Sequence, residues 1–174
     1  MCGARPMAAS ATTIEEFTAI DPLETLEVFA RRADMDAQRI DETELHVNLN
    51  GSWRDVGIWF AWRTEAQVLQ IGAPLEMRVP KARAAEVYKL LALVNERLWF
   101  GHFDLNVEEG GIVYRNSAVL PVGQSIDDCQ AEILLRGAMD AFERFYPAFN
   151  FAIWGGMAAE EALDAAVSDT AGTA

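Results

Sequence analysis

The chain has 174 residues, 51% of them hydrophobic and 24% charged, a composition typical of one globular domain rather than of a disordered segment. Its 27 acidic residues outnumber its 14 Lys and Arg residues, and the net charge of −13 repels phosphate backbones. Binding to nucleic acid would need a local basic patch, and the pairs Arg31/Arg32 and Lys81/Arg83 are too short to form one. We therefore expect no nucleic-acid partner.

Cysteine usage and hydropathy indicate the compartment. Cys2 and Cys129 are the only cysteines. One is near the N-terminus and the other is in a predicted helix, so we expect no structural disulfide between them. The first residues lack the apolar core of a secretory signal, and no apolar run approaches the roughly 18 residues that span a bilayer. These features predict a cytoplasmic protein without a membrane partner.

The N-terminal half is predicted to be a helix followed by three strands. Residues 1–20 form a flexible or weakly helical lead-in, and Asp21 with Pro22 then provides a helix start. Apolar residues alternate in 45–49 and 56–62, and Asn50-Gly51 predicts a tight hairpin turn because both residues tolerate positive φ. A third strand runs over 69–79 with a bend or bulge at Pro74.

The C-terminal half is predicted to contain a helix, two strands and a further long helix. A helix from Lys81 to about Trp99 is followed by strands over 103–107 and 112–120. Ser125 is expected to cap the last long helix, which Pro147 ends or divides, before a short terminal helix and a flexible tail over 167–174. The predicted buried stripe of that helix consists of Ile126, Cys129, Ile133, Met139, Phe142 and Tyr146.

The predicted order is therefore α-βββ-α-ββ-α plus a C-terminal helix. Helices gathered on one face of an antiparallel five-stranded sheet make an α+β fold. Hairpin turns join most of the strands, which disfavours a parallel sheet. We expect one domain over 21–166.

The sequence contains one weak candidate for a catalytic site. His102 and Asp104 share a face of a predicted strand and could act as a base and its orienting carboxylate, although no motif places a nucleophile beside them. The alternative is a solvated strand surface that follows a turn at Gly101. Two isolated histidines, His46 and His102, make no zinc set, and the acidic run over 34–44 lacks the pattern of a calcium loop and is interpreted as a solvated connection. We expect no catalytic residue, metal or cofactor.

Tryptophans are the stronger candidates for an interaction surface. If Val56, Ile58, Phe60 and Trp62 face the helices, then Trp53 and Trp59 point to the opposite face of the sheet. Large aromatic side chains on both faces indicate that the second face is covered. A partner subunit or a client protein could cover it, and so could the C-terminal helix around Trp154.

Three segments, "VNERLWFGHFDL", "GIVYRNSAVLP" and "AFERFYPAFNFAIWGG", together resemble the YbjN family of bacterial proteins. The residues that carry the resemblance are Asn95, Gly101, Phe103, Tyr114, Arg115, Tyr146, Pro147, Trp154, Gly155 and Gly156. Members of this family are described as bacterial sensory-transduction regulators, and their fold is similar to that of type III secretion chaperones, which are small, acidic homodimers that bind extended segments of other proteins. The family has no established catalytic residues.

The resemblance and the residues lead to one functional prediction with an alternative. We predict a non-enzymatic regulatory or protein-binding module, homodimeric, with Trp53, Trp59 and Trp154 as candidate interaction residues and a protein or peptide client. The alternative is a small enzyme that uses His102 and Asp104.

Overall fold

The computed structural model describes residues 21–106 and 108–171. In these residues, four α-helices and one short 3₁₀ helix accompany a six-stranded sheet. The strands are β1 (Asp36–Arg39), β2 (Glu44–Leu49), β3 (Val56–Arg63), β4 (Val68–Arg78), β5 (His102–Leu105) and β6 (Gly111–Val119). The helices are α1 (Pro22–Arg32), η1 (Lys81–Arg83), α2 (Ala84–Asn95), α3 (Asp128–Ile153) and α4 (Ala159–Ala171).

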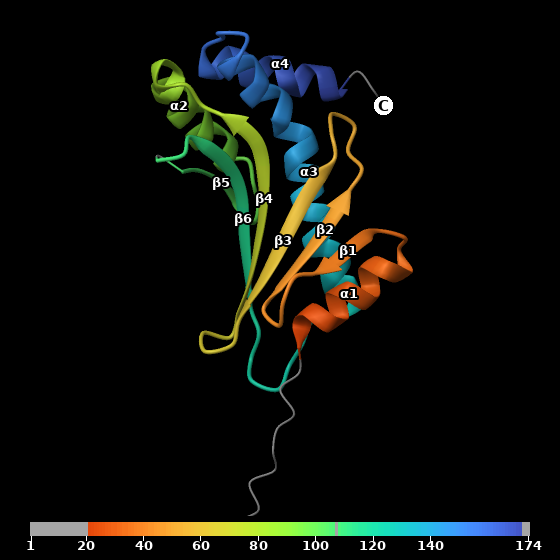
Figure 1. The fold of residues 1–174 in the computed structure, drawn as a ribbon. Coiled ribbons are helices and arrows are strands. Elements are labelled where there is room, and N and C mark those ends of the chain that lie inside the picture. The colour runs from red at the N-terminus through yellow and green to blue at the C-terminus, as the bar shows by residue number, and fades with distance from the viewer. Residues whose placement is uncertain (1–20, 107, 172–174) are drawn as a thin grey trace, which may run out of the picture.

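The sheet is antiparallel throughout, in the order β1-β2-β3-β4-β6-β5 (Figure 1). Its first four strands form a meander. Helix α2 then connects β4 to β5, which forms the other edge of the sheet, and β6 lies between β5 and β4. The predicted bulge at Pro74 is present, because the pairing of β4 with β6 shifts between Pro74 and Arg78.

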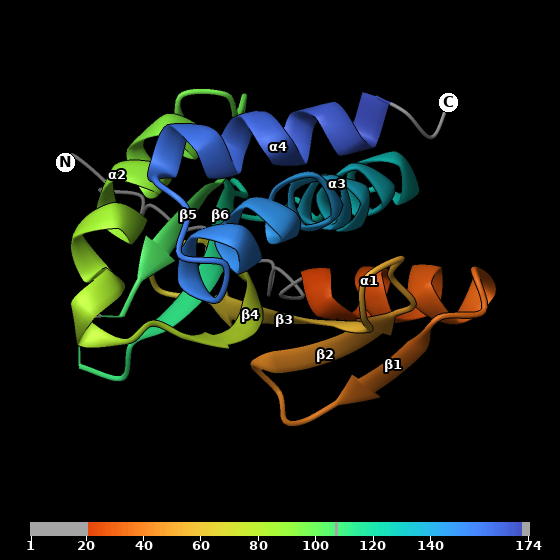
Figure 2. The same cartoon turned by 90° about the horizontal axis from the view of Figure 1, so that it is seen from above.

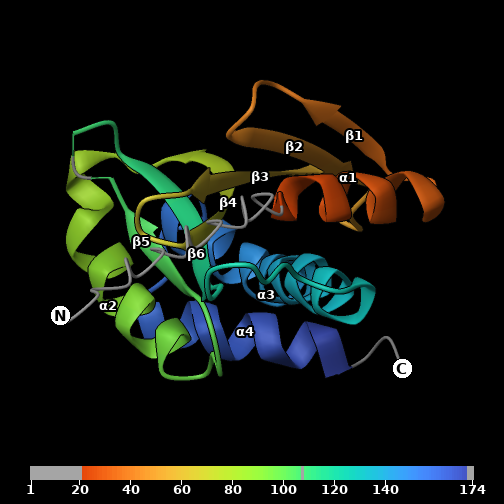
Figure 3. The same cartoon turned by 90° about the horizontal axis from the view of Figure 1, so that it is seen from below.

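All the helices lie on one side of the sheet, as Figures 2 and 3 show from above and below. Helix α1 packs on β1 to β3, α3 crosses the middle strands, α2 contacts β5, and α4 lies outermost against α2 and α3. The apolar core fills the space between the two layers and includes Phe60, Phe103 and Phe142. The other side of the sheet, which we call the open face, carries none of the described helices.

The prediction of five strands is wrong because it omitted β1. The segment Asp36–Arg39 alternates between exposed and half-buried residues and contains only one apolar side chain, Ala37. A strand at the edge of a sheet needs only backbone pairing on one side, so its sequence carries no strong hydrophobic period. What we interpreted as a solvated acidic connection is in part this edge strand.

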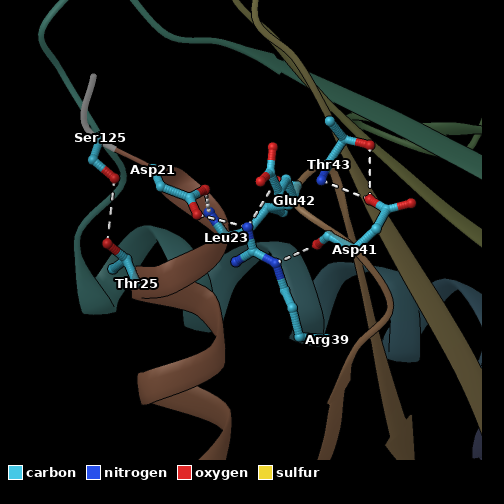
Figure 4. A network of polar contacts seen from close by, with 8 residues as sticks. All are labelled: Asp21, Leu23, Thr25, Arg39, Asp41, Glu42, Thr43 and Ser125. Carbon is cyan, nitrogen blue, oxygen red and sulfur yellow. Dashed lines mark hydrogen bonds and ion pairs between the residues drawn. The ribbon is translucent and has the colours of Figure 1, made fainter. Parts of the chain in front are cut away.

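Helix α1 begins as predicted, at an Asp21 cap followed by Pro22, with the Asp21 carboxylate accepting from the Leu23 N–H at 2.9 Å. The same carboxylate accepts from the Arg39 guanidinium at 2.6 Å (Figure 4). Arg39 also donates to the carbonyls of Asp41 and Glu42, so one side chain ties the start of α1 to the turn after β1. In that turn, hydrogen bonds from Thr43 lower the pKa of Asp41.

Helix α3 differs most from expectation. Its cap is Asp127, which forms a capping box with Gln130, rather than Ser125. Pro147 lies inside the helix and does not end it. Cys129 is exposed, so the predicted stripe has the wrong phase at its start. The buried residues of α3 are Ala131, Leu135, Ala138, Ala141, Phe142, Phe145, Pro147, Ala148, Phe149, Ala152 and Ile153.

The turn from α2 into β5 is confirmed at Gly101, which has a φ of +72°. Asn95 ends α2, and its side chain both accepts from the Phe103 N–H at 2.8 Å and donates to the Phe103 carbonyl at 3.0 Å. The Phe103 ring then enters the core against Tyr114 and Phe149, with ring centroids 5.5 and 5.2 Å away. Asn95 therefore acts as a side-chain substitute for a pairing strand.

The described part of the chain ends in a helix. Helix α4 continues to Ala171, past the expected boundary at residue 166. The predicted lead-in over 1–20, with Cys2, lies outside the described residues. Within the described part of the chain, no helix is both long and apolar enough to cross a membrane.

Candidate protein-binding surface

The open face is organised by one row of side chains that crosses all six strands. The register of the strand pairs places one residue of each strand side by side in this row. From edge to edge the row reads Gln38, His46, Trp59, Gly72, Arg115 and His102. Two of the candidate site residues, Trp59 and His102, therefore belong to the same face and the same row.

Trp59 lies flat against the sheet because its neighbour in the row is a glycine. A Cβ atom added to Gly72 would stand 2.1 Å from the Trp59 ring, so the indole occupies the space where a side chain would be. The ring is half-buried by this contact. It forms one wall of a depression of about 340 Å³ whose lining also includes Gln70, His102 and Arg115.

His102 and Asp104 are both exposed on β5, as the alternation of that strand predicts. The Asp104 carboxylate lies 3.4 Å from Nε of Arg115 on the neighbouring strand, an ion pair without an aligned hydrogen bond. Both partners are substantially exposed, so the pair adds little stability. Among the described residues, no hydrogen bond joins Asp104 to His102, and the carboxylate is thus directed toward Arg115 rather than placed to orient the imidazole.

Trp53 does not share the open face with Trp59, which corrects the expectation from sequence. It belongs to the loop between β2 and β3, and its indole N–H donates to the Glu143 carbonyl of α3 at 3.2 Å. That carbonyl would normally accept from the N–H four residues later, which is Pro147 and has none. The Trp53 indole therefore satisfies the acceptor that the proline leaves free, while half of the Trp53 surface stays exposed, at 50%.

Trp154 lies in a third place. It is 66% exposed at the end of α3, beside Val79 and Pro80 at the end of β4. Helices α3 and α4, before and after Trp154 in the chain, lie on the side of the sheet opposite to the open face, and Phe149 and Ile153 of α3 are in the core. The suggestion that the C-terminal helices cover the open face is therefore wrong, and the three tryptophans form no continuous surface.

A hollow between the helices and one end of the sheet was not anticipated from the sequence. It has a volume of about 960 Å³ and lies between the end of α1, the adjoining ends of β1 to β3, the bulge of β4 and the middle of α3. We call it the α1–α3 groove. Its floor contains four half-buried apolar side chains that pack on the core, namely Phe29, Met35, Leu49 and Met139.

The rim of the groove is charged. Its carboxylates come from Asp34, Asp36, Asp55, Glu76, Glu132 and Asp140, and its guanidinium groups from Arg54 and Arg136. These residues are contributed by four separate segments of the chain, so no local spacing in the sequence could have grouped them. Only Asp34 and Asp36 belong to the acidic run that the sequence singled out.

Two of the rim acids occupy unusual backbone positions. Asp34 follows α1 at φ +57°, where the Met35 N–H returns to the Ala30 carbonyl and closes the helix end. Glu76 lies in the bulge of β4 at φ +52°. Glycine is the usual residue at such positions, and a side chain there carries a conformational cost of about 1–2 kcal/mol.

The architecture defines a class before any family. A six-stranded antiparallel sheet with helices on one face is an α+β fold similar to that of type III secretion chaperones. Residues 22–151 match the model of the YbjN family, described as "Putative bacterial sensory transduction regulator". The chain belongs to the YbjN family. Among curated proteins, none matches the chain.

Two solved structures, the E. coli YbjN and the ExsC–ExsE complex, agree with this assignment at the level of the fold. The crystal structure of YbjN from E. coli, described as "a putative transcription regulator", aligns with a TM-score of 0.52 and 13% identity, over 87% of this chain and 97% of that chain. The ExsC–ExsE complex aligns with a TM-score of 0.51 and 20% identity, over 71% of this chain and 89% of the other. The HopA1–SchA chaperone–effector complex gives a TM-score of 0.47 and 12% identity, over 68% and 87% of the two chains.

Proposed function

We propose that this protein is a non-enzymatic binding module that holds a segment of another polypeptide, as a chaperone-like adaptor in bacterial signalling or stress response. The observation that carries the proposal is the α1–α3 groove. Four half-buried apolar side chains, including two methionines, line a hollow of about 960 Å³ at the surface. Flexible methionine side chains are common at surfaces that accommodate varied polypeptide partners.

The fold supports this proposal by analogy. One structure with a similar fold is a complex of two proteins, ExsC and ExsE. A shared fold does not by itself transfer a function, so the analogy adds to the groove and does not replace it.

The enzymatic alternative receives less support from the open face. That alternative assigns the Asp104 carboxylate to orient the His102 imidazole, and the carboxylate lies against Arg115 instead. Replacing His102 by Ala tests the alternative directly. We expect the variant to rescue a deletion strain fully, and failure to rescue with a stable protein would favour catalysis.

The assembly we propose is a homodimer through the open face, with Trp59 at its centre. A twofold contact would bury the same indole of both chains. Because Trp53 lies elsewhere, the apolar area is smaller than the sequence suggested, and we expect a weak dimer that dissociates on dilution. Sedimentation velocity over a concentration series tests this: a mass of 19.2 kDa at every concentration would contradict it. Trp59→Ser should remove the concentration dependence and leave helix content unchanged.

Site-specific photo-crosslinking in cells tests the binding function. A photoreactive amino acid at Met139 reports on the floor of the groove, and the same amino acid at the exposed Tyr88 on α2, away from both the groove and the open face, is the matched control. We expect a discrete protein adduct from the Met139 position alone. Equal adducts from both positions, or none from Met139, would contradict a polypeptide-binding groove.

A further inference from the structure

We infer that the α1–α3 groove selects a positively charged polypeptide segment, one in which Lys or Arg residues flank apolar residues. This inference rests on the proposed function and specifies its partner. Two features of the groove carry it: the rim is negatively charged, and the floor between these charges is apolar.

The rim carries more negative charge than the fold itself neutralises. Of the six acidic side chains that line the groove, Glu76 pairs with Arg54 and Glu132 pairs with Arg136, which uses both arginines. Four carboxylates remain: Asp34, Asp36, Asp55 and Asp140. Of these, Asp36 accepts a hydrogen bond from the Asn48 amide at 2.9 Å, which does not neutralise its charge.

The four remaining carboxylates surround the apolar floor. Asp34 and Asp36 lie at the α1–β1 connection, Asp55 lies before β3, and Asp140 is on α3 beside Met139. A ligand that places apolar side chains on the floor therefore brings its flanking groups next to carboxylates from more than one side. Cationic flanking groups would form ion pairs there, and acidic groups would be repelled.

A negatively charged rim around an apolar floor limits the chemical class of ligand that the groove can bind. Nucleic acids and acidic peptides are repelled by both the rim and the net charge of −13. A metal ion does not need an apolar floor, and the described residues contain no cluster of three or more potential metal ligands. The chain's own residues 1–20 hold one arginine and two glutamates, so they offer no cationic complement. A basic segment with apolar anchors satisfies rim and floor together.

The test uses three short fluorescein-labelled peptides that share the same Leu and Phe positions and carry Lys, Gln or Glu at all the others. Fluorescence anisotropy with the full chain should give the tightest binding for the Lys peptide, and this binding should weaken as salt is added. The double variant Asp55→Asn with Asp140→Asn should bind the Lys peptide about tenfold more weakly, as expected for two exposed ion pairs. It should bind the Gln peptide unchanged.

The matched control removes two charges elsewhere. Glu108→Gln with Glu109→Gln changes the net charge equally in the β5–β6 turn, away from the groove. An equal loss of Lys-peptide affinity in this control would mean that only the overall field acts, and would overturn the inference. Met139→Ser should weaken both the Lys and the Gln peptide, and a Lys peptide insensitive to it would be held by charge alone, which also overturns the inference.

The outcomes separate this inference from the function beneath it. If the Gln or Glu peptide binds as tightly as the Lys peptide and depends on Met139, the groove binds polypeptides but charge does not select them. If no peptide binds and photo-crosslinking at Met139 gives no adduct, the proposed function itself fails.

Discussion

Replacing Gly101 by valine should destabilise the protein far more than replacing its neighbour His102 by alanine. Gly101 has a φ of +72°, which is unfavourable for a β-branched residue. A Cβ atom added there would also stand 2.2 Å from the hydroxyl oxygen and 2.5 Å from Cζ of Tyr114. The Tyr114 ring is only 1% exposed and packs edge-on against Phe103, so it has no free space into which to move.

The magnitude follows from adding these two effects. The left-handed backbone costs about 1–2 kcal/mol for a residue with a Cβ atom, and overpacking a buried site costs about 1–3 kcal/mol more. The sum is about 2–5 kcal/mol, which for a domain of this size lowers the melting temperature by about 4–20 °C. His102 is exposed, so its replacement should change the free energy of unfolding by no more than about 0.5 kcal/mol.

Thermal and urea unfolding followed by circular dichroism measure both variants. Gly156 provides the control for the backbone effect, because its φ is +69° and an added Cβ would have no neighbour within 4 Å. Gly156→Ala should therefore show the backbone cost alone, and Gly101→Ala should show that cost plus the clash with Tyr114. Equal melting shifts for Gly101→Val and His102→Ala would refute the placement of the turn.

Substitutions at three further residues test contacts that hold the elements together. Trp53→Phe removes the donor to the Glu143 carbonyl and should cost about 0.5–1.5 kcal/mol in urea unfolding, whereas no loss would mean that water replaces the indole. Asn95→Ala leaves both backbone groups of Phe103 unpaired and should cost about 1–3 kcal/mol, with Asn95→Asp recovering only the accepted bond. The hydrogen bond and ion pair with Lys89 of α2 lower the pKa of Glu160. Glu160→Gln should therefore be less stable than the wild type at neutral pH, and the difference in the free energy of unfolding should vanish as the pH falls through that lowered pKa.

Much of the fold was predictable because the central strands carry a strong hydrophobic period. In β3 the residues Val56, Ile58, Phe60 and Trp62 alternate, and all four face the helices. A period of two fixes which residues face the core, since a shift by one position would expose all of them. The edge strand β1 has no such period, and its existence depends on a neighbour that is recognised only after the chain has folded.

The interior proline marks the limit of local reasoning in α3. From sequence alone Pro147 predicts an end or a break, because it removes one helical hydrogen bond. The helix continues because the residues on both sides, Phe145 and Phe149, are in the core, and because an indole ninety positions away in the chain supplies the missing donor. Rules for helix ends consider only residues close to the proline in sequence, so they do not predict this donor.

The candidate site was less predictable than the fold. Trp59 was placed on the correct face by alternation, since strand geometry alone decides it. Trp53 was misplaced because the chain leaves β2 at Leu49 and does not enter β3 until Val56, so alternation does not extend to it. The α1–α3 groove is assembled from segments that are distant in sequence, and a single sequence gives no signal for such an arrangement.

The loop that carries Trp53 also connects the proline to the groove. Beside the indole, the Glu143 carboxylate accepts from the Ser52 N–H at 2.5 Å, so one turn of α3 holds the loop at two points. Gly51 permits this approach, because a Cβ atom there would stand 2.8 Å from that carboxylate oxygen. The same loop then presents Arg54 and Asp55 at the rim of the groove. The acceptor that Pro147 frees in the helix is thus used to position one wall of the surface to which we assign binding.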